Sequence, residues 1–341
     1  MKKSVFISIL LFAFWACQSS LDDKQPNVRD LADREEFIYV PSDTNKAKFL
    51  ERLEASGVLN DIESFMRVAE KRNLYQRWKP GKFRLLGHYT NRQICELLIN
   101  GTPEKVTVKF PFSFNTGQIA RRITKFVEPD SAQLQATFTD STITKNLKNF
   151  THSEDLLPLF SVDSVIVLWN CKPIEIIQKA DSLYGKFWNA ERQQKADSIG
   201  LSPYQVSILA SIVRSEQRQY PDEWPVIAGL YMNRLKTGMP LQSDPTIIYA
   251  HGDFTMKRVL NSHLEIESPF NTYKYAGLPP RCIAIPSAAA IDAVLNYEKH
   301  KFIYMCAKED LSGRHNFTAN YSQHQRNAKA YQKAITKKGI K

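Results

Sequence analysis

Cysteine is scarce in this sequence and never occurs in a closely spaced pair. The 341 residues include five cysteines, which lie far apart and form no CxxC pair. The sequence therefore implies no structural zinc site, and we expect no metal. If the chain is exported, disulfides are open to the four cysteines after Cys17, but the sequence does not pair them. Cys171 and Cys306 lie in apolar runs and are expected to be buried thiols.

A dense cluster of lysine and arginine is also missing, as is any zinc-finger or RNA-recognition signature. The chain has 46 Lys and Arg against 35 Asp and Glu, a formal net charge of +11 that is spread along its length. A basic surface favours anionic partners, such as membrane headgroups or an acidic polymer. Without a nucleic-acid motif, we expect no nucleic-acid partner.

The longest apolar stretch at the N-terminus is too short for a membrane-spanning helix, which needs about 20 residues. Lys2 and Lys3 precede an apolar run over 5–16, as in a secretory signal. The end of this run resembles a bacterial lipoprotein signal, in which Cys17 becomes lipidated, although Phe14 stands where Leu is usual. We therefore expect 1–17 to be a signal segment that anchors the chain in the cell envelope, facing the periplasm. An ordinary cleaved signal and a short uncleaved anchor remain alternatives.

No internal repeat or long low-complexity segment is visible, so the domains are read from the order of the predicted elements. Residues 18–35 are polar without an apolar period and predict a tether. The next region, 36–104, resembles a LysM module, a small fold that grips cell-wall glycans; a generic α/β packing unit is the alternative. Its predicted elements are a strand over 37–40, helices over 43–56 and 61–73, a strand over 82–85 and a helix over 90–99.

Residues 105–200 predict a connecting α/β region. It contains strands over 105–110 and 162–169, a helix over 116–126, a polar stretch over 131–155 and one long helix over 173–198. Beyond it, 201–335 predicts further helices, including one over 288–297, and a strand over 302–305. The fold class expected is α+β: a small LysM-like N-terminal α/β module followed by a mixed α+β domain.

The stretch 201–239 predicts a helix, a short acidic break and a second helix. Glu216 falls near the end of the first helix and continues an apolar stripe. A carboxyl group among apolar neighbours tends to stay protonated, as a general acid must. The alternative is a solvated Glu paired with Arg214 or Arg218. The stripe consists of Val206, Leu209 and Val213.

Loops rich in Gln, Asp, Asn, Thr, Tyr and Pro follow at 241–249, 268–273 and 277–280. Short polar side chains on proline-stiffened loops suit hydrogen bonding to a hydroxyl-rich or amide-rich ligand. Tyr249 and Tyr273 have rings that can stack on sugar faces. The alternative is that these loops only connect elements.

Together these segments resemble the endolytic murein transglycosylases of the MltG/YceG-like family, tightly over about 200–330. Its pattern has Ala-Ser-Ile-Val leading to a catalytic Glu, then Asn-Arg-Leu, Gly-Met-x-Leu-Gln-Ser-Asp-Pro-Thr, Ser-Pro-Tyr-Asn-Thr-Tyr, Gly-Leu-Pro-Pro, His-x-Phe and a later His. The matching positions here are 210–213 with Glu216, 233–235, 238–246, 268–273 (with Phe270 for Tyr), 277–280, His315 with Phe317, and His324.

The resemblance implies a peptidoglycan lytic transglycosylase with its catalytic core in 201–335 and no cofactor. Such enzymes cleave the β-1,4 bond between N-acetylmuramic acid and N-acetylglucosamine and form a 1,6-anhydro end. Glu216 would act first as acid and then as base. The family is also thought to end growing glycan strands beside the cell-wall synthesis machinery. The substrate-binding residues implied are Asn233, Gln242, Ser243, Asp244, Thr246, Ser268, Asn271, Thr272, Tyr273 and His315.

Two positions depart from the family pattern. Arg214 stands where a second acidic residue is usual, and 163–166 replaces a Thr-Tyr pair. Two rival functions therefore stay open. One is a muramidase-like hydrolase with Asp244 or Asp222 as base, and the other is a non-catalytic glycan-binding lipoprotein.

Overall fold

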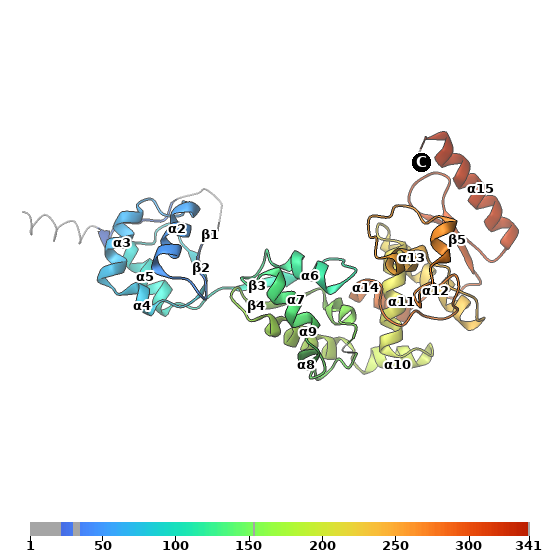
Figure 1. Cartoon of the computed structure of the whole chain (residues 1–341), viewed down its shortest axis with the longest axis horizontal. Helices are drawn as coiled ribbons and strands as arrows, with labels where there is room; N and C mark the ends of the chain where they lie inside the picture. Colours follow the sequence, from blue (N-terminus) through green and yellow to red (C-terminus); the bar gives the residue numbers. More distant parts are fainter. Residues whose placement is uncertain (1–21, 30–34, 153, 340–341) are drawn as a thin grey trace, which may run out of the picture. The chain divides into compact units, whose positions relative to one another are not determined.

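The computed structural model describes residues 22–29, 35–152 and 154–339 (Figure 1). The expected signal over 1–17 and parts of the expected tether lie outside these residues. The chain forms two compact units. The first comprises residues up to Val108 with Thr124–Pro129 and Ile166–Lys172. The second comprises Lys109–Ile123, Asp130–Val165 and the chain from Pro173 onward.

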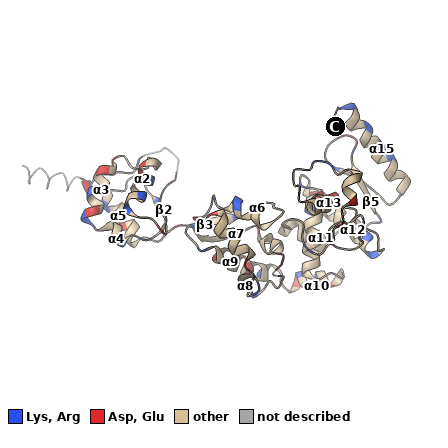
Figure 2. Ribbon diagram, viewed as in Figure 1, with Lys and Arg blue, Asp and Glu red and all other residues tan. Residues whose placement is uncertain are grey.

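Charged residues are scattered over the elements of both units (Figure 2). This distribution agrees with the spread of charge in the sequence. Within the described part of the chain, no helix combines the length and apolar character needed to cross a membrane.

The first unit has the strands and helices predicted for 36–104, with one further short helix between the second helix and the second strand. Its two strands pair antiparallel, with Ile38 opposite Phe83, and both of these side chains are buried. The alternate residues Tyr39 and Lys82 face the other side of the sheet, as the two-residue period of a strand requires. The elements are β1 (Glu36–Val40), α2 (Lys46–Ser56), α3 (Ile62–Lys71), α4 (Leu74–Arg77), β2 (Gly81–Leu85) and α5 (Asn91–Asn100).

The described part of the predicted tether, 22–29, packs against this unit. Val28 is buried in the same apolar cluster as β1 and β2. Asn27 is buried too: its amide accepts from the Asp61 backbone N–H at 2.7 Å and donates to Asn91 Oδ1 at 2.6 Å. The tether prediction does not hold for this segment. A polar residue that is held by hydrogen bonds leaves no apolar period in the sequence.

The helix predicted over 173–198 is two helices in the structure. The first ends at Phe187, and Asn189 then caps the second by accepting a hydrogen bond from the Arg192 backbone N–H at 3.0 Å. The elements of this region are β3 (Lys105–Lys109), which pairs with β4 (Ser164–Leu168), and α6 (Thr116–Ile123), α7 (Ser131–Thr139), α8 (Ser141–Thr144), η1 (Leu157–Val162), α9 (Pro173–Phe187) and α10 (Ala190–Ser198).

From residue 201 onward, the second unit is built around α11 (Pro203–Glu216), on which α12 (Trp224–Lys236), α13 (Asp244–His251) and α14 (Ala288–Leu295) pack. The remaining elements are η2 (Pro221–Glu223), η3 (Asn261–Glu265), β5 (Tyr304–Ala307), β6 (His315–Thr318) and α15 (Tyr321–Lys337). The antiparallel pair β5–β6 supports α15. The strand predicted over 302–305 begins two residues later than expected. The mixed α+β architecture predicted from the sequence is confirmed.

Candidate active site

Glu216 is the last residue of α11, as the apolar stripe predicted. The helix starts at a capping box made by Ser202 and Gln205, and it ends where Gln217 turns to an extended conformation. The eight residues of α11 over 206–213 are all buried. A helix that is buried over these eight residues therefore carries the Glu216 carboxyl group from the core to its site.

Two hydroxyl groups hold one oxygen of this carboxyl group. Tyr231 Oη donates to Glu216 Oε1 at 2.6 Å, and Ser243 Oγ donates to the same atom at 2.5 Å. Tyr231 comes from α12 and Ser243 from the loop before α13, and both are fully buried. Among the described residues, no hydrogen-bond partner is present for Oε2. The second oxygen therefore remains available to a ligand.

Burial raises the pKa of Glu216. The Ser243 and Tyr231 hydroxyls oppose this because they favour the charged form, while the nearby Asp244 charge adds to the rise in the pKa. The net direction is upward. Since Oε1 already accepts two hydrogen bonds, the proton of the neutral acid belongs on Oε2. This is the arrangement that a general acid needs.

Glu216 lines a pocket of about 210 Å³. Four of the predicted substrate-binding residues line it as well: Gln242, Asp244, Tyr273 and His315. The loop and strand motifs after α12 therefore converge on the carboxyl group, as the sequence predicted. The remaining wall is formed by Leu230, Tyr231, Arg234, Leu241, Met305, Cys306 and Ala307.

Ser243 is held in place by a buried hydroxyl pair beneath the pocket. Its backbone N–H donates to Thr272 Oγ1 at 3.0 Å, and Thr246 Oγ1 lies 2.8 Å from the same atom. The preceding residue, Gln242, has a φ of 49°, a left-handed conformation that costs a non-glycine residue about 1–3 kcal/mol. Thr246 and Thr272, predicted to bind substrate, thus support Ser243 and do not line the pocket.

Asp244 is the first residue of α13, where the helix dipole favours a negative charge. It accepts a hydrogen bond from Tyr273 Oη at 2.5 Å. Burial raises the pKa of Asp244, and the Tyr273 hydroxyl opposes this rise. Asp244 is therefore a second, separately tethered carboxyl group on the pocket wall.

Besides Ser243, Thr246 and Thr272, three further predicted substrate-binding residues lie outside the lining of the pocket. Asn233 donates to the carbonyls of His300 and Phe302, at 2.8 and 3.0 Å. Asn271 is fully buried and donates to the carbonyls of Leu264 and Ile266, at 2.8 and 2.9 Å. The prediction that Asn233 and Asn271 line the cleft is wrong, because both amides fasten loops.

Ser268, the third of these residues, also acts within its own loop. Its hydroxyl accepts from the Phe270 backbone N–H at 3.2 Å, and its carbonyl accepts from the Asn271 N–H at 2.9 Å. These contacts shape the turn that carries Thr272 and Tyr273. Ser268 therefore affects the site only indirectly, because it shapes the backbone that positions Thr272 and Tyr273.

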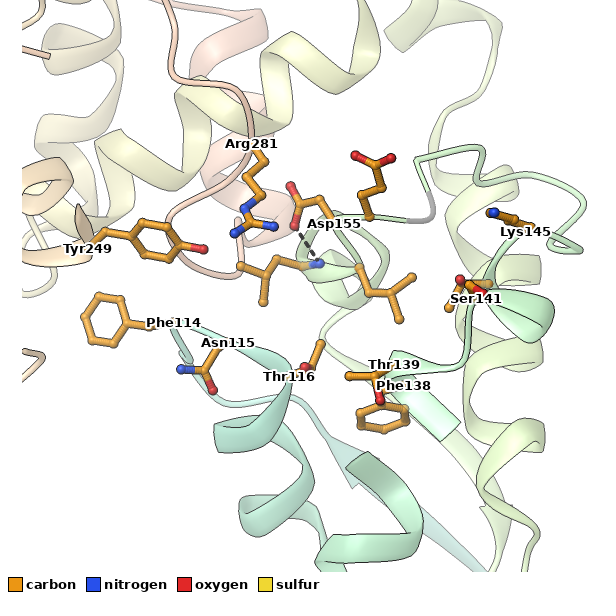
Figure 3. Close-up of a pocket in the computed structure, with 14 residues that line it drawn as sticks. Phe114, Asn115, Thr116, Phe138, Thr139, Ser141, Lys145, Asp155, Tyr249 and Arg281 are labelled. Carbon is orange, nitrogen blue, oxygen red and sulfur yellow. Dashed lines mark hydrogen bonds between the residues drawn. The ribbon is translucent and has the colours of Figure 1, made fainter. Parts of the chain in front are cut away.

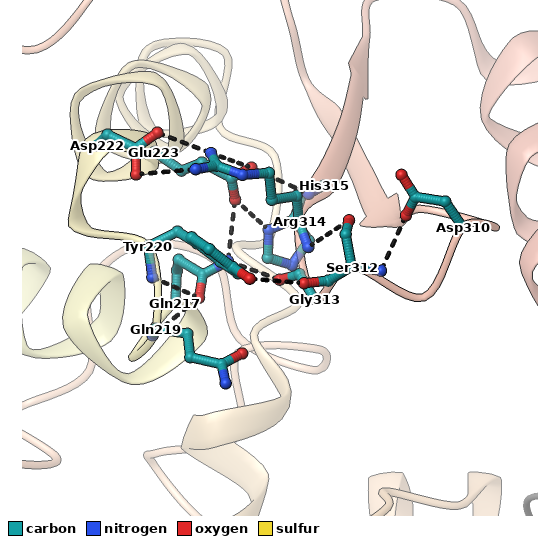
Figure 4. Close-up of polar contacts among 10 residues, drawn as sticks. All are labelled: Gln217, Gln219, Tyr220, Asp222, Glu223, Asp310, Ser312, Gly313, Arg314 and His315. Carbon is teal, nitrogen blue, oxygen red and sulfur yellow. Dashed lines mark hydrogen bonds and ion pairs between the residues drawn. The ribbon is translucent and has the colours of Figure 1, made fainter.

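A network of polar contacts fixes His315 (Figure 4). Glu223 accepts from the His315 backbone N–H at 3.1 Å and lies 2.8 Å from its ring Nδ1. Gln217, the residue after the catalytic candidate, donates to Glu223 Oε2 at 3.0 Å and to the Gly313 carbonyl at 2.8 Å. Since Nδ1 is engaged, Nε2 is the ring nitrogen that His315 can offer to a ligand.

Three residues of the site were missed by sequence reasoning: Tyr231, Glu223 and Arg234. Arg234 is buried and donates to the carbonyls of Leu241 and Ile303, both at 2.7 Å. Its position inside the Asn-Arg-Leu segment was a usable signal. Tyr231 gave none, since an aromatic residue in an apolar helix normally belongs to the core.

Arg214 points away from Glu216. Its guanidinium donates to the Ile285 carbonyl at 2.7 Å and lies over the Phe112 ring. Burial lowers the pKa of Arg214, and the Asp163 charge opposes this. The basic residue at the position of the family's second acid therefore makes no contact with the pocket. In the described residues, no cluster of His, Cys, Asp and Glu is arranged to hold a metal ion.

The pattern of the YceG-like family matches residues 38–330. This chain belongs to the YceG-like family. Two relatives are each named endolytic murein transglycosylase. That of Bacillus subtilis is 34% identical over 168 residues, 49% of this chain and 44% of the relative. That of Streptococcus pneumoniae D39 is 25% identical over 326 residues, 85% of this chain and 57% of the relative. This YceG-like chain thus aligns with about half the length of these relatives.

The fold has a solved counterpart. The crystal structure of a YceG-like protein from Listeria monocytogenes matches with a TM-score of 0.59 at 22% sequence identity. The match covers 86% of this chain and 99% of that one. At this identity the likeness concerns the YceG-like fold alone.

Proposed function

We propose that this protein is an endolytic lytic transglycosylase of peptidoglycan. It would cleave the β-1,4 bond between N-acetylmuramic acid and N-acetylglucosamine and leave a 1,6-anhydro end. The observation that carries the proposal is the Glu216 carboxyl group, whose pKa is raised and whose Oε1 accepts two hydroxyl hydrogen bonds, while its Oε2 has no hydrogen-bond partner among the described residues. Further support comes from the two relatives named endolytic murein transglycosylase.

The chemistry uses one acid twice. Glu216 Oε2 gives its proton to the glycosidic oxygen as the bond from that oxygen to C1 of the muramic residue breaks. The C6 hydroxyl of the same muramic residue then attacks C1, and its proton passes to the Glu216 carboxylate. The atoms balance without water, and the acid is restored. Ordinary glycosidases differ because they need two carboxyl groups.

The test is product analysis on intact sacculi with the full chain. We expect mass spectrometry to find 1,6-anhydro ends with the wild type and none above background with Glu216→Gln. Glu265→Gln, an exposed surface change of the same chemical kind, serves as the control and is expected to match the wild type. Cleavage that persists in Glu216→Gln would remove Glu216 from the reaction.

A muramidase-type hydrolase is the second candidate, and Asp244 is the observation that keeps it open. Asp244 lines the pocket with Glu216, whereas Asp222 is exposed and paired with Arg314 at 2.7 Å. Asp244 is thus the better placed of the two bases considered. Reducing ends in the same digest would favour this reaction. Sedimentation with sacculi without any cleavage would instead favour a glycan-binding protein.

We further propose that residues 36–104 are a LysM-like glycan-binding module. The N-terminus would anchor the protein to the membrane, facing the periplasm. The protein would end nascent glycan strands beside the cell-wall synthesis machinery. Support comes from the order of β1, α2, α3 and β2 and from the signal-like sequence before Cys17. Membrane fractionation of wild type and Cys17→Ser tests the anchor. Strand lengths in cells with and without the protein test its role in termination.

A further inference from the structure

The second unit contains a larger pocket that the proposed reaction does not use (Figure 3). Its volume is about 560 Å³, and it is lined by segments far apart in sequence. Phe114 and Asn115 precede α6, Lys145 follows α8, Tyr249 lies on α13, and Arg281 belongs to a loop before α14. None of these residues lines the pocket of Glu216.

The two pockets differ in volume, which indicates that they hold different parts of the substrate. Pockets for small ligands usually measure about 300–1,000 Å³. The pocket of Glu216, at about 210 Å³, lies below that range, while the second pocket lies well inside it. An enzyme that cuts inside a polymer must hold more of its substrate than the bond it breaks. The second pocket has the volume to do so.

The Tyr249 ring is fixed as a wall of this pocket by other aromatic rings. Its centroid is 4.7 Å from Phe270 and 6.3 Å from Phe254, and Phe254 stacks on Phe114 at 4.3 Å with an interplanar angle of 9°. A rigid aromatic wall with a polar tip suits a ligand that has both apolar and hydroxyl surfaces. A sugar ring, with its C–H face and its hydroxyl edge, is such a ligand.

The charges at the rim favour a ligand with a carboxylate. Lys145 and Arg281 are exposed cations on the lining, and Glu154 is the exposed acid among the lining residues. The other acid there, Asp155, is buried and already accepts hydrogen bonds from the Cys282 N–H at 2.8 Å, the Leu157 N–H at 3.2 Å and Tyr204 Oη at 3.1 Å. Asp155 therefore fastens the pocket wall and offers little to a ligand.

One short helix joins the two pockets. Asp244 begins α13 and lines the pocket of Glu216, and Tyr249 lies five residues further along the same helix. At the rise of an α-helix this is about 7 Å along the axis. Five residues also turn the helix by about 140°, so the two side chains leave α13 on different sides, and a chain of linked sugars that fills both pockets must pass around this helix.

We propose that the pocket of Tyr249 and Arg281 is a distal subsite for the same glycan strand. It takes an N-acetylated sugar whose carboxylate-bearing substituent faces Arg281 and Lys145, and Tyr249 packs on the ring. This inference rests on the proposed function, because it takes its ligand class from there. It adds that the enzyme needs strands long enough to fill both pockets.

The experiment measures binding of murein glycan fragments of increasing length to full-length Glu216→Gln protein, so that no cleavage intervenes. In that background we compare Arg281→Ala, Tyr249→Leu and the control Tyr275→Ala, an exposed tyrosine outside both pockets. We expect Arg281→Ala to weaken binding of long fragments about tenfold, the size of a lost hydrogen bond to a charged group. Short fragments and the control are expected to bind as before. Circular dichroism checks that each variant is folded.

Equal weakening for short and long fragments, or no weakening in Arg281→Ala, would overturn the proposal. The result is separable from the reaction itself. If sacculi yield no anhydro ends but long fragments still need Arg281, the proposed activity fails and the subsite stands. If anhydro ends form while binding is independent of length, the activity stands and the subsite fails. Tyr249→Leu is also expected to weaken binding of long fragments, and unchanged binding would overturn the packing of Tyr249 on the sugar ring.

Discussion

Glu223 binds His315 at two points, through the backbone N–H at 3.1 Å and the ring Nδ1 at 2.8 Å. Burial raises the pKa of Glu223, but the hydrogen bonds from His315 and Gln217 outweigh it, and the net direction is downward. The carboxylate is therefore charged where it holds the ring. The break between α11 and α12 and the start of β6 are locked together at the edge of the pocket of Glu216.

Changing Glu223 to Gln is expected to slow cleavage about tenfold, since a hydrogen bond to a charged group contributes about 1.5–3 kcal/mol. His315 would lose its fixed orientation toward the pocket. Single-turnover rates on sacculi measure the effect. The Glu223→Gln variant should also be less stable than the wild type, and this difference should shrink as the pH falls. The lowered pKa of Glu223 stabilises the wild-type fold only while its carboxylate is charged, and that contribution is lost when the carboxylate is protonated.

Asp222→Asn is the matched control for this change. Asp222 is exposed and pairs with Arg314 at 2.7 Å beside the same network. An exposed ion pair contributes little to stability, so the control should keep nearly full activity. Equal losses in the two variants would show that the network acts only through surface charge.

Replacing Ser243 by Ala is expected to move the alkaline limb of the pH–rate profile to higher pH. The Ser243 hydroxyl favours the charged form of Glu216, so its removal raises the pKa of that acid further. The protonated acid then persists to higher pH. The measurement is kcat/KM against pH, beside Ser268→Ala, which alters a serine outside the pocket. A downward shift would contradict this account of Glu216.

Glu216→Gln should raise the thermal stability of the protein near neutral pH by a few degrees, about 1 kcal/mol. Burial raises the folded-state pKa of Glu216, so its favourable contribution is fully present below the unfolded pKa and is lost as the pH rises through the folded pKa. Thermal denaturation at acid and neutral pH tests the sign. The advantage of the Gln variant should vanish below about pH 4. A variant less stable than wild type at neutral pH would refute it.

Arg234→Lys is expected to destabilise the second unit by about 3 kcal/mol, since an ammonium group cannot reach carbonyls on both sides of the guanidinium. The affected acceptors are the carbonyls of Leu241 and Ile303. Denaturant unfolding measures the loss. Lys236→Ala on the same helix removes an exposed cation and should change stability little; a loss as large as that of Arg234→Lys would argue against the carbonyl contacts.

In the first unit, Asn27→Ala should cost about 2–3 kcal/mol, because it leaves buried partners at Asp61 and Asn91 without their hydrogen bonds. Limited proteolysis and thermal unfolding report the change, with the exposed Lys24→Ala as control. Unchanged stability would mean that 22–29 behaves as the tether that its composition indicates.

Sequence periodicity was sufficient where apolar burial determines the structure. The stripe before Glu216 located both α11 and the depth of its carboxyl group, because burial of one face leaves a regular period. The resemblance to the family then predicted Gln242, Asp244 and His315 as site residues, and all three line the pocket of Glu216. The gap in the predicted helix over 173–198 was missed, since the Asn189 cap is a single polar residue within a helical pattern.

The roles of polar residues were harder to predict. Asn233 and Asn271 have the same amide as a sugar-binding residue, but their acceptors are the carbonyls of His300 and Leu264. Whether an amide meets a carbonyl or a ligand depends on how distant loops pack, and the spacing of residues along the chain does not report that. Tyr231 shows the converse, because its ring belongs to the core and its hydroxyl to the site.

Because Tyr231 and Ser243 both occupy Oε1, a single atom, Glu216 Oε2, must deliver one proton and collect another. The departing sugar and the attacking hydroxyl must therefore stand at that atom in turn. In the proposed reaction, the cleaved glycosidic oxygen moves away from Oε2 before the C6 hydroxyl gives its proton to that atom. A cleaved strand that stays bound at this atom would then slow the enzyme, and turnover would depend on how quickly that strand dissociates.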